Sequence, residues 1–468
     1  MDVCVMNLNK EKLKEYALSS VRFIAGVYYV IIIMLIALLV VSHPTLSDIF
    51  TTGSDRVTTL SGRSSKIERD IVVDASLLDR SGGVTTLTKN IIEKVALKRP
   101  DWRFNVLLYH QNPELLELSS LDNVNFIMTV PQYSFFYEIL FNILNCTTFG
   151  LFKDKLLQLI YYDTIFLDNK CDLFWDPNGS GAISDFEMPK ITTIHDLVPI
   201  EKSEFFKKER ADWIKRRFIE SIKSSEKLIT VSNFSKKKIQ DRYGVSSDFV
   251  KVIPIRLANR LHFNLSKEDI EITLKKFDVS PQKYMVFVSQ YYQSKNFERL
   301  IKAFAKFSHK KELGETTNLK LVFVGNLVYS RGEIEKFAEQ YKTGNNIIFT
   351  HVVTNKELQI LLSNALFFIH PSLYEGFGMP IIEAMACGIP VTCSNRSSLP
   401  EVAGDAALFF DPYNIDDIAK AIEKMATDSA LRSQLSQKGL ERAKLFQNTD
   451  AMTDDYVKVF EEAMKKEE

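Results

Sequence analysis

The sequence is poor in cysteine and has no excess of charge of either sign. Its 468 residues include 59 basic and 59 acidic side chains, so the formal net charge at pH 7 is zero. A nucleic-acid-binding protein needs a basic surface that neutralises phosphates, and the composition therefore argues against that class. The five cysteines are an odd number, are scattered and show no C-x-x-C spacing, which argues against a disulfide framework and a zinc site. We therefore expect a reducing compartment.

The chain also lacks a D-x-D motif and any histidine or cysteine spacing typical of a metal site. We therefore predict no metal site. The length of 468 residues exceeds that of one ordinary hydrophobic core, so two domains and an appendage are expected.

A long apolar run is present near the N-terminus. Residues 23–41, FIAGVYYVIIIMLIALLVV, carry no charge and are long enough to cross most of a bilayer. A buried core helix or a signal peptide is the alternative, but the run is longer than a signal h-region and no small-residue cleavage site follows it. We predict an N-terminal flank at 1–22, a transmembrane helix at 23–41 and a Ser/Thr-rich stalk at 42–68.

Two later stretches share one design. Residues 70–97 and 284–307 each pass from a β-rich apolar run through a loop into a helix with one apolar face. Each is typical of the first β–α unit of a doubly wound domain, so we predict an α/β fold with two Rossmann-like halves. The predicted boundaries are 69–255 for the N-terminal half, 256–283 for a linker with one short helix, 284–450 for the C-terminal half and 451–468 for a C-terminal helix.

The loop PSLYEGFG, residues 371–378, follows an apolar strand and precedes a helix that begins near Pro380. Gly376 and Gly378 allow the backbone to approach a ligand, and the helix start offers free N–H groups. This arrangement favours a diphosphate. Such loops lie at the carboxyl ends of strands, where doubly wound folds bind their ligands.

Two glutamates flank this turn, and carboxylates repel a diphosphate. Glu375 and Glu383 therefore fit the site only if they face neutral groups that donate hydrogen bonds, such as sugar hydroxyls. A diphosphate between two polyols is a sugar nucleotide. The alternative is that the glycines only shape a turn and that the glutamates are solvated surface.

Residues 359–414, especially SLYEGFGMPIIEAMACGIPV and SSLPEVAGDAALFFDP, closely resemble the donor-binding region of glycosyltransferase family 4. The resemblance continues more weakly through ITTIHDLVPI, LITVSNFSKKKI and LKLVFVGN, from about residue 70 to about residue 460. It implies the GT-B fold, in which two Rossmann-like domains face a cleft, and retention of configuration at the anomeric carbon. The E-x7-E pair of the family falls on Glu375 and Glu383.

The resemblance also implies roles for residues of the C-terminal half. Glu375 contacts donor-sugar hydroxyls, Glu383 holds the ribose, and Lys295 neutralises the leaving diphosphate. The backbone of the turn that contains Gly376, Phe377 and Gly378 takes the phosphates.

In the N-terminal half, His195 matches the family histidine that faces the donor sugar. Gly82 and Gly83 match the glycine-rich first loop. A structural His-Asp pair and a plain strand-to-helix turn are the respective alternatives. The chain departs from the family where an arginine is replaced by Gln290 or Ser294, and where IRLA stands at residues 255–258 in place of NGVD.

We predict a membrane-anchored, metal-independent hexosyltransferase without a cofactor. It moves a hexose, with mannose as the first guess, from GDP-mannose or a UDP-sugar to a glycan or lipid-linked glycan acceptor. The aromatic segment 132–162 forms a lipid-facing groove or core helices. The basic segment 207–218, with Trp213, faces an anionic membrane or only water. A sugar-nucleotide epimerase and an inactive glycan-binding scaffold are the rival functions.

The membrane topology is predicted from two opposing signals. Lys10, Lys12, Lys14 and Arg22 precede the apolar run, while only Arg56 follows closely, which places the catalytic part in the lumen by the positive-inside rule. Unpaired cysteines and a need for sugar nucleotides favour the cytosol. We expect a cytosol-facing catalytic part, with a lumenal type II protein as the alternative.

Overall fold

The structure is a computed structural model. It describes residues 67–75, 78, 83–108, 111–128, 171–179, 188–257, 261, 263–290, 292–325, 331–341, 343 and 346–465. The predicted transmembrane helix 23–41 and the aromatic segment 132–162 lie outside these residues, as do the N-terminal flank and most of the stalk. Within the described ranges, no helix combines the length and the apolar character that a membrane crossing requires.

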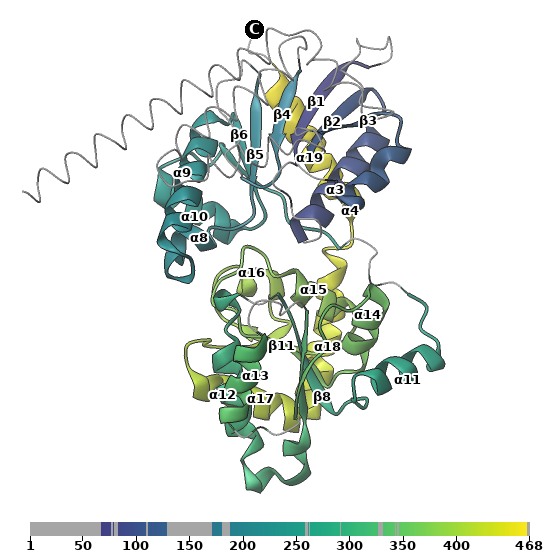
Figure 1. Cartoon of the computed structure of the whole chain (residues 1–468), viewed down its shortest axis with the longest axis vertical. Coiled ribbons are helices and arrows are strands. Elements are labelled where there is room, and N and C mark those ends of the chain that lie inside the picture. The colour runs from purple at the N-terminus through teal and green to yellow at the C-terminus, as the bar shows by residue number, and fades with distance from the viewer. Residues whose placement is uncertain are drawn as a thin grey trace, which may run out of the picture. The chain divides into compact units, whose positions relative to one another are not determined.

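The first sheet is built entirely from parallel pairs, in the order β3-β2-β1-β4-β5-β6-β7. The inner strands β2, β1, β4, β5 and β6 are almost wholly buried, as expected for a parallel sheet covered by helices, whereas β3 and β7 at the two edges are only partly buried. The strands are β1 (Arg69–Asp74), β2 (Trp102–Leu108), β3 (Val124–Met128), β4 (Leu173–Asp176), β5 (Lys190–Ile194), β6 (Lys227–Thr230) and β7 (Val250–Val252). The helices are α3 (Gly83–Lys98), α4 (Pro113–Leu116), α8 (Val198–Glu201), α9 (Lys208–Ser224) and α10 (Asn233–Tyr243), with short η1 (Glu117–Ser120) and η3 (Ser203–Phe205) (Figure 1).

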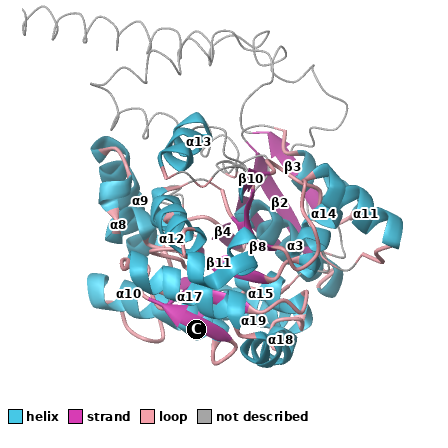
Figure 2. Cartoon of the chain, turned by 90° about the horizontal axis from the view of Figure 1, so that it is seen from below, coloured by secondary structure: helices cyan, strands magenta, loops and turns pink. Residues whose placement is uncertain are grey.

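The second sheet is also parallel, in the order β10-β9-β8-β11-β12-β13. Figure 2 shows its strands in magenta among cyan helices. The strands are β8 (Tyr284–Val288), β9 (Lys320–Val324), β10 (Ile347–Phe349), β11 (Phe367–His370), β12 (Val391–Ser394) and β13 (Ala407–Phe410). The helices are α11 (Lys267–Lys276), α12 (Phe297–Ser308), α13 (Arg331–Gln340), α14 (Asn355–Asn364), α15 (Met379–Ala386), α16 (Leu399–Ala403), α17 (Ile415–Thr427) and α18 (Ser429–Lys444), with η4 (Gln293–Lys295) and η5 (Lys311–Asn318). Two parallel Rossmann-like sheets confirm the predicted α/β fold with two Rossmann-like halves, whereas the predicted transmembrane helix lies outside the described residues and has no support from them.

The strand order places β8 directly beside β11. Lys295 follows β8 and Glu375 follows β11, so two residues that are 80 positions apart in the sequence lie in neighbouring loops. From β8 the chain proceeds outward to β9 and β10, then returns to β11 and proceeds the other way. This reversal is a topological switch point, where the loops after the two central strands diverge and leave room for a ligand.

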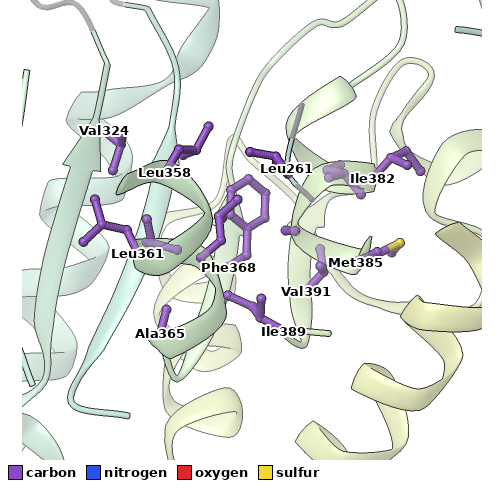
Figure 3. Close-up of a cluster of buried hydrophobic side chains, with 14 of the residues drawn as sticks. Leu261, Val324, Leu358, Leu361, Ala365, Phe368, Ile382, Met385, Ile389 and Val391 are labelled. Carbon is purple, nitrogen blue, oxygen red and sulfur yellow. The ribbon is translucent and has the colours of Figure 1, made fainter. Parts of the chain in front are cut away.

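A large apolar cluster lies between this sheet and the helices α14 and α15. Phe368 of β11 is fully buried at its centre, with Leu361 of α14 and Met385 of α15 among its neighbours (Figure 3). The cluster fixes β11 and α15 with respect to each other, and so fixes the two ends of the loop that joins them.

The last helix, α19 (Thr449–Met464), packs on the first sheet, although it follows the second sheet in sequence. In Figure 1 it is the yellow helix beside α3. Tyr456 and Phe460 are buried against Trp175 of β4, with ring centroids 5.6 and 5.4 Å away. The C-terminal helix that we predicted at 451–468 therefore completes the core of the N-terminal half.

Candidate functional site

The turn between β11 and α15 is shaped by two glycines that have no steric substitute. A Cβ atom on Gly376 would lie 1.9 Å from the backbone oxygen of His195, which no side chain tolerates. Gly378 has a φ of 109° and occupies the N-cap position of α15, where Pro380 follows in the first turn. The turn therefore brings the first-sheet backbone and the start of α15 together.

Glu375 is the centre of a buried charged cluster in this turn. Its Oε1 atom lies 2.6 Å from Lys295 Nζ and 3.0 Å from His370 Nε2, and its backbone N–H donates to Ser397 Oγ at 3.0 Å. Only 13% of the Glu375 side chain and 20% of the Lys295 side chain are exposed. Within the described part of the chain, Oε2 of Glu375 accepts no hydrogen bond.

Burial by itself would raise the pKa of Glu375, but Lys295 and His370 outweigh it and hold that pKa well below the ordinary value. The carboxylate is therefore ionised at neutral pH. It can accept hydrogen bonds from a ligand through Oε2, which is what a sugar hydroxyl requires.

Lys295 reaches this cluster because the loop after β8 is bonded to the loop after β11. The backbone N–H of Leu373 donates to the Ser294 oxygen at 2.8 Å. Asn296 adopts a left-handed φ of 63°, and its Nδ2 donates to the Pro371 and Pro412 oxygens at 3.0 and 2.8 Å. The asparagine thereby ends η4 with Lys295 directed at Glu375.

His370 is fully buried at the end of β11. Its ring stacks on Phe368 at 5.8 Å and meets the edge of Phe287 at 5.6 Å. Burial lowers the pKa of His370 in spite of the neighbouring Glu375. The neutral ring donates from Nε2 to Glu375, because a lone pair in that position would face an ionised oxygen.

Phe377 and Glu383 are both almost fully buried. Phe377 is buried against Phe446, with ring centroids 5.7 Å apart, and its backbone oxygen lies 2.9 Å from Ser398 Oγ. Glu383 is in the second turn of α15 and is 3% exposed. The predicted contact of Glu383 with a ribose and that of the turn with phosphates stay predictions.

The site residues predicted in the N-terminal half are His195, Gly82 and Gly83. His195 follows β5, its Nε2 lies 2.8 Å from the Pro177 oxygen, and burial lowers its pKa. Its backbone faces Gly376, as described above, and Ser232 Oγ donates to the Gly376 oxygen at 2.7 Å. Gly83 begins α3, and a Cβ there would meet nothing within 4 Å, while Gly82 lies outside the described residues.

Sequence reasoning missed His370, Ser397 and Asn296. His370 had a usable signal, because it ends the strand that precedes the predicted turn, where ligand-facing side chains gather. Ser397 and Asn296 had no such signal, since their role depends on contacts across neighbouring loops.

Comparison with known proteins identifies the family. Residues 269–442 match the family described as Glycosyl transferases group 1. O-antigen chain mannosyltransferase B of Escherichia coli is 30% identical over 257 residues, which are 55% of this chain and 66% of that protein. The serotype-specific mannosyltransferase WbdA of Escherichia coli is 27% identical over 262 residues, which are 55% of this chain and 31% of WbdA. The matched part of this chain thus spans 66% of the length of the first relative and 31% of the length of the second.

Among solved structures, Anabaena Alr3699/HepE in complex with UDP-glucose superposes with a TM-score of 0.63. The match covers 84% of this chain and 100% of that one at 15% identity, so it shows a shared fold only. Together with the two parallel sheets and the turn at Glu375, these matches show that the chain belongs to the group 1 glycosyltransferases and has the GT-B fold, in agreement with the predicted family 4.

Proposed function

We propose that this glycosyltransferase transfers mannose from a nucleoside diphosphate sugar to a glycan or lipid-linked glycan, with retention of configuration. The observation that carries the proposal is the pairing of Lys295 with Glu375 at the switch point of the second sheet, beside the N-terminus of α15. A cation and a helix start favour a diphosphate, and a buried carboxylate whose Oε2 accepts no hydrogen bond from the described residues favours sugar hydroxyls.

In the proposed reaction, the bond between the sugar C1 atom and the diphosphate oxygen breaks, and a bond from C1 to an acceptor hydroxyl oxygen forms on the same face. The acceptor proton passes to the departing phosphate. Lys295 stabilises the negative charge that grows on the diphosphate, and the backbone N–H groups at the start of α15 add their dipoles. Glu375 orients the sugar through its hydroxyls.

Mannose is favoured as the transferred sugar because the two E. coli relatives are mannosyltransferases. The UDP-glucose bound to Anabaena HepE keeps a UDP-sugar as the alternative donor. The test offers GDP-mannose, UDP-glucose and UDP-galactose to the purified full chain, with donor turnover and product linkage measured together. We expect GDP-mannose to give the highest turnover, with an α-linked product.

Two other functions remain as outcomes of that test. Conversion of the donor to an epimeric sugar without transfer would support a sugar-nucleotide epimerase, which shares the fold. Tight donor binding with neither transfer nor hydrolysis, across lipid-linked acceptors, would support a glycan-binding scaffold. The scaffold is favoured by Gln290 and Ser294, which stand where the family has an arginine.

We propose further that the protein acts at a membrane, with its catalytic part in the cytosol. The apolar run 23–41 supports attachment. Helix α9 supports a membrane-facing surface, because Trp213 is 38% exposed and Arg217 lies 5.0 Å from its ring. Protease added to sealed vesicles of cytosol-inside orientation should spare the globular part, and its digestion would place that part in the lumen.

A further inference from the structure

We infer that His370 is a positioning residue that holds Glu375 in place while Lys295 changes partners during the reaction. The inference rests on the proposed function for its catalytic meaning. It concerns a side chain that touches no substrate and acts only through the Glu375 carboxylate, 3.0 Å away.

Lys295 and Glu375 are paired with each other, but in the proposed reaction each must bind a different part of the donor. In the structure each neutralises the other at 2.6 Å, yet Lys295 must pair with the diphosphate and Glu375 must accept sugar hydroxyls. When a diphosphate draws Lys295 away, the buried carboxylate loses its ion-pair partner. A buried ionised group left without partners is strongly disfavoured, so it would change its rotamer or take up a proton.

His370 contacts the same oxygen of Glu375 as Lys295 does. Both Lys295 Nζ and His370 Nε2 lie on Oε1 of Glu375. After Lys295 leaves, the imidazole N–H still fixes Oε1 and keeps Oε2 directed to where a hydroxyl can donate. Ser372 Oγ lies 3.2 Å from the same Nε2 atom and adds a second polar contact to it.

A histidine at position 370 lowers the stability of the fold relative to an apolar ring of similar size. The ring fills an aromatic slot between Phe287 and Phe368, which a phenylalanine would fill without polar atoms. Its Nδ1 atom is buried and has no hydrogen-bond partner among the described residues. Since an unsatisfied buried acceptor destabilises the fold, packing does not explain a histidine here, whereas the bond to Glu375 does.

The test compares His370→Phe with His370→Gln in the full chain, with the donor that the wild type turns over. Phenylalanine keeps the packing and removes the donor, and glutamine restores an N–H near the Nε2 position. We expect kcat of His370→Phe to fall about 10- to 100-fold, as for a lost hydrogen bond to a charged group, with the donor KM within about threefold. His370→Gln should recover most of that loss.

Tyr284→Phe is the matched control, because it removes another fully buried hydrogen bond of the same sheet, from Tyr284 Oη to the Leu361 oxygen at 2.7 Å. It should leave kcat unchanged. A His370→Phe variant with the wild-type kcat, or a glutamine variant as slow as the phenylalanine variant, would overturn the inference. Failure of the wild type to transfer any sugar would instead overturn the proposed function.

A spectroscopic measurement tests the inference independently of turnover. The ring ¹⁵N signals of His370, assigned by their loss in His370→Gln, should report a neutral ring protonated at Nε2. Addition of GDP or UDP should leave this tautomer in place, while Glu375→Ala should shift the Nε2 signal. A ring protonated at Nδ1, or one that does not respond to Glu375→Ala, would contradict the positioning role.

Discussion

The two glutamates of the E-x7-E pair occupy different environments. Glu375 lies in the loop after β11 and shares Oε1 between Lys295 and His370, whereas Glu383 lies within α15 and is almost fully buried. The interaction of a side chain with the sugar near the reacting carbon can strengthen as the bond breaks. A side chain that holds the remote ribose binds the ground state and the transition state equally well.

We therefore predict that Glu375→Ala lowers kcat more than it weakens donor binding, and that Glu383→Ala mainly raises the donor KM. Each effect should be about ten- to a hundredfold, the magnitude of a lost charged hydrogen bond of roughly 1.5–3 kcal/mol. Lys295→Ala should follow Glu375→Ala, because the diphosphate charge grows as the bond breaks. Steady-state kinetics measure both parameters, and wild-type efficiency in all three variants would refute the site assignment.

His370 also makes stability depend on pH. Burial lowers its pKa in the folded protein below the ordinary value of 6.5, so between these values the unfolded chain binds a proton that the folded chain does not. The stability that the neutral ring provides is present above pH about 6.5 and is lost as the pH falls towards the folded-state pKa.

Wild-type protein should therefore lose more thermal stability between pH 7.5 and pH 5.5 than His370→Gln, which has no such group. Differential scanning fluorimetry at both pH values measures the difference. His195, whose pKa is also lowered by burial, is present in both proteins and cancels in the comparison. If both proteins lost the same thermal stability, folding would not lower the pKa of His370.

At the scale of elements, α19 joins the end of the chain to the N-terminal half. Its buried aromatic residues form a cluster with Trp102 and Trp175 of the first sheet. The chain has three tryptophans, and the third, Trp213, lies in α9 of the same half, so tryptophan fluorescence reports on the N-terminal half alone.

We predict that Phe460→Ala destabilises the N-terminal half by about 3–5 kcal/mol, the usual cost of removing a buried aromatic ring. Urea unfolding followed by tryptophan fluorescence measures the change. Leu445→Ala is the control, because that side chain is 58% exposed and precedes α19. If the two variants unfolded at the same urea concentration, α19 would not belong to this core.

For the molecule as a whole, the proposed reaction needs a counter-charge for the negative charge of the leaving diphosphate. Lys295 and the start of α15 lie where the switch point of the second sheet would place a diphosphate. We therefore predict full transfer in the presence of EDTA, measured by product formation with and without the chelator. Loss of turnover in EDTA, restored by magnesium or manganese, would refute this prediction.

The order of strands and helices and the identity of the central turn were predictable from the sequence. The apolar run at the start of residues 284–307 is β8, and the predicted apolar face of the helix that follows is buried in α12, where it consists of Phe297, Leu300, Ile301 and Phe304. The helix start near Pro380 was also predicted correctly, since α15 begins at Met379. These features depend on periodicity, glycine and proline, which act over a few residues of the chain.

The contacts between side chains far apart in the sequence depend on the three-dimensional fold. The sheet order sets β8 beside β11, and this places Lys295 and His370 on one oxygen of Glu375, with a separation of 80 residues between Lys295 and Glu375. The same holds for α19, which returns to the first sheet after the second is complete. Contacts of this kind follow from the order of strands and the packing of helices, which a local sequence pattern does not specify.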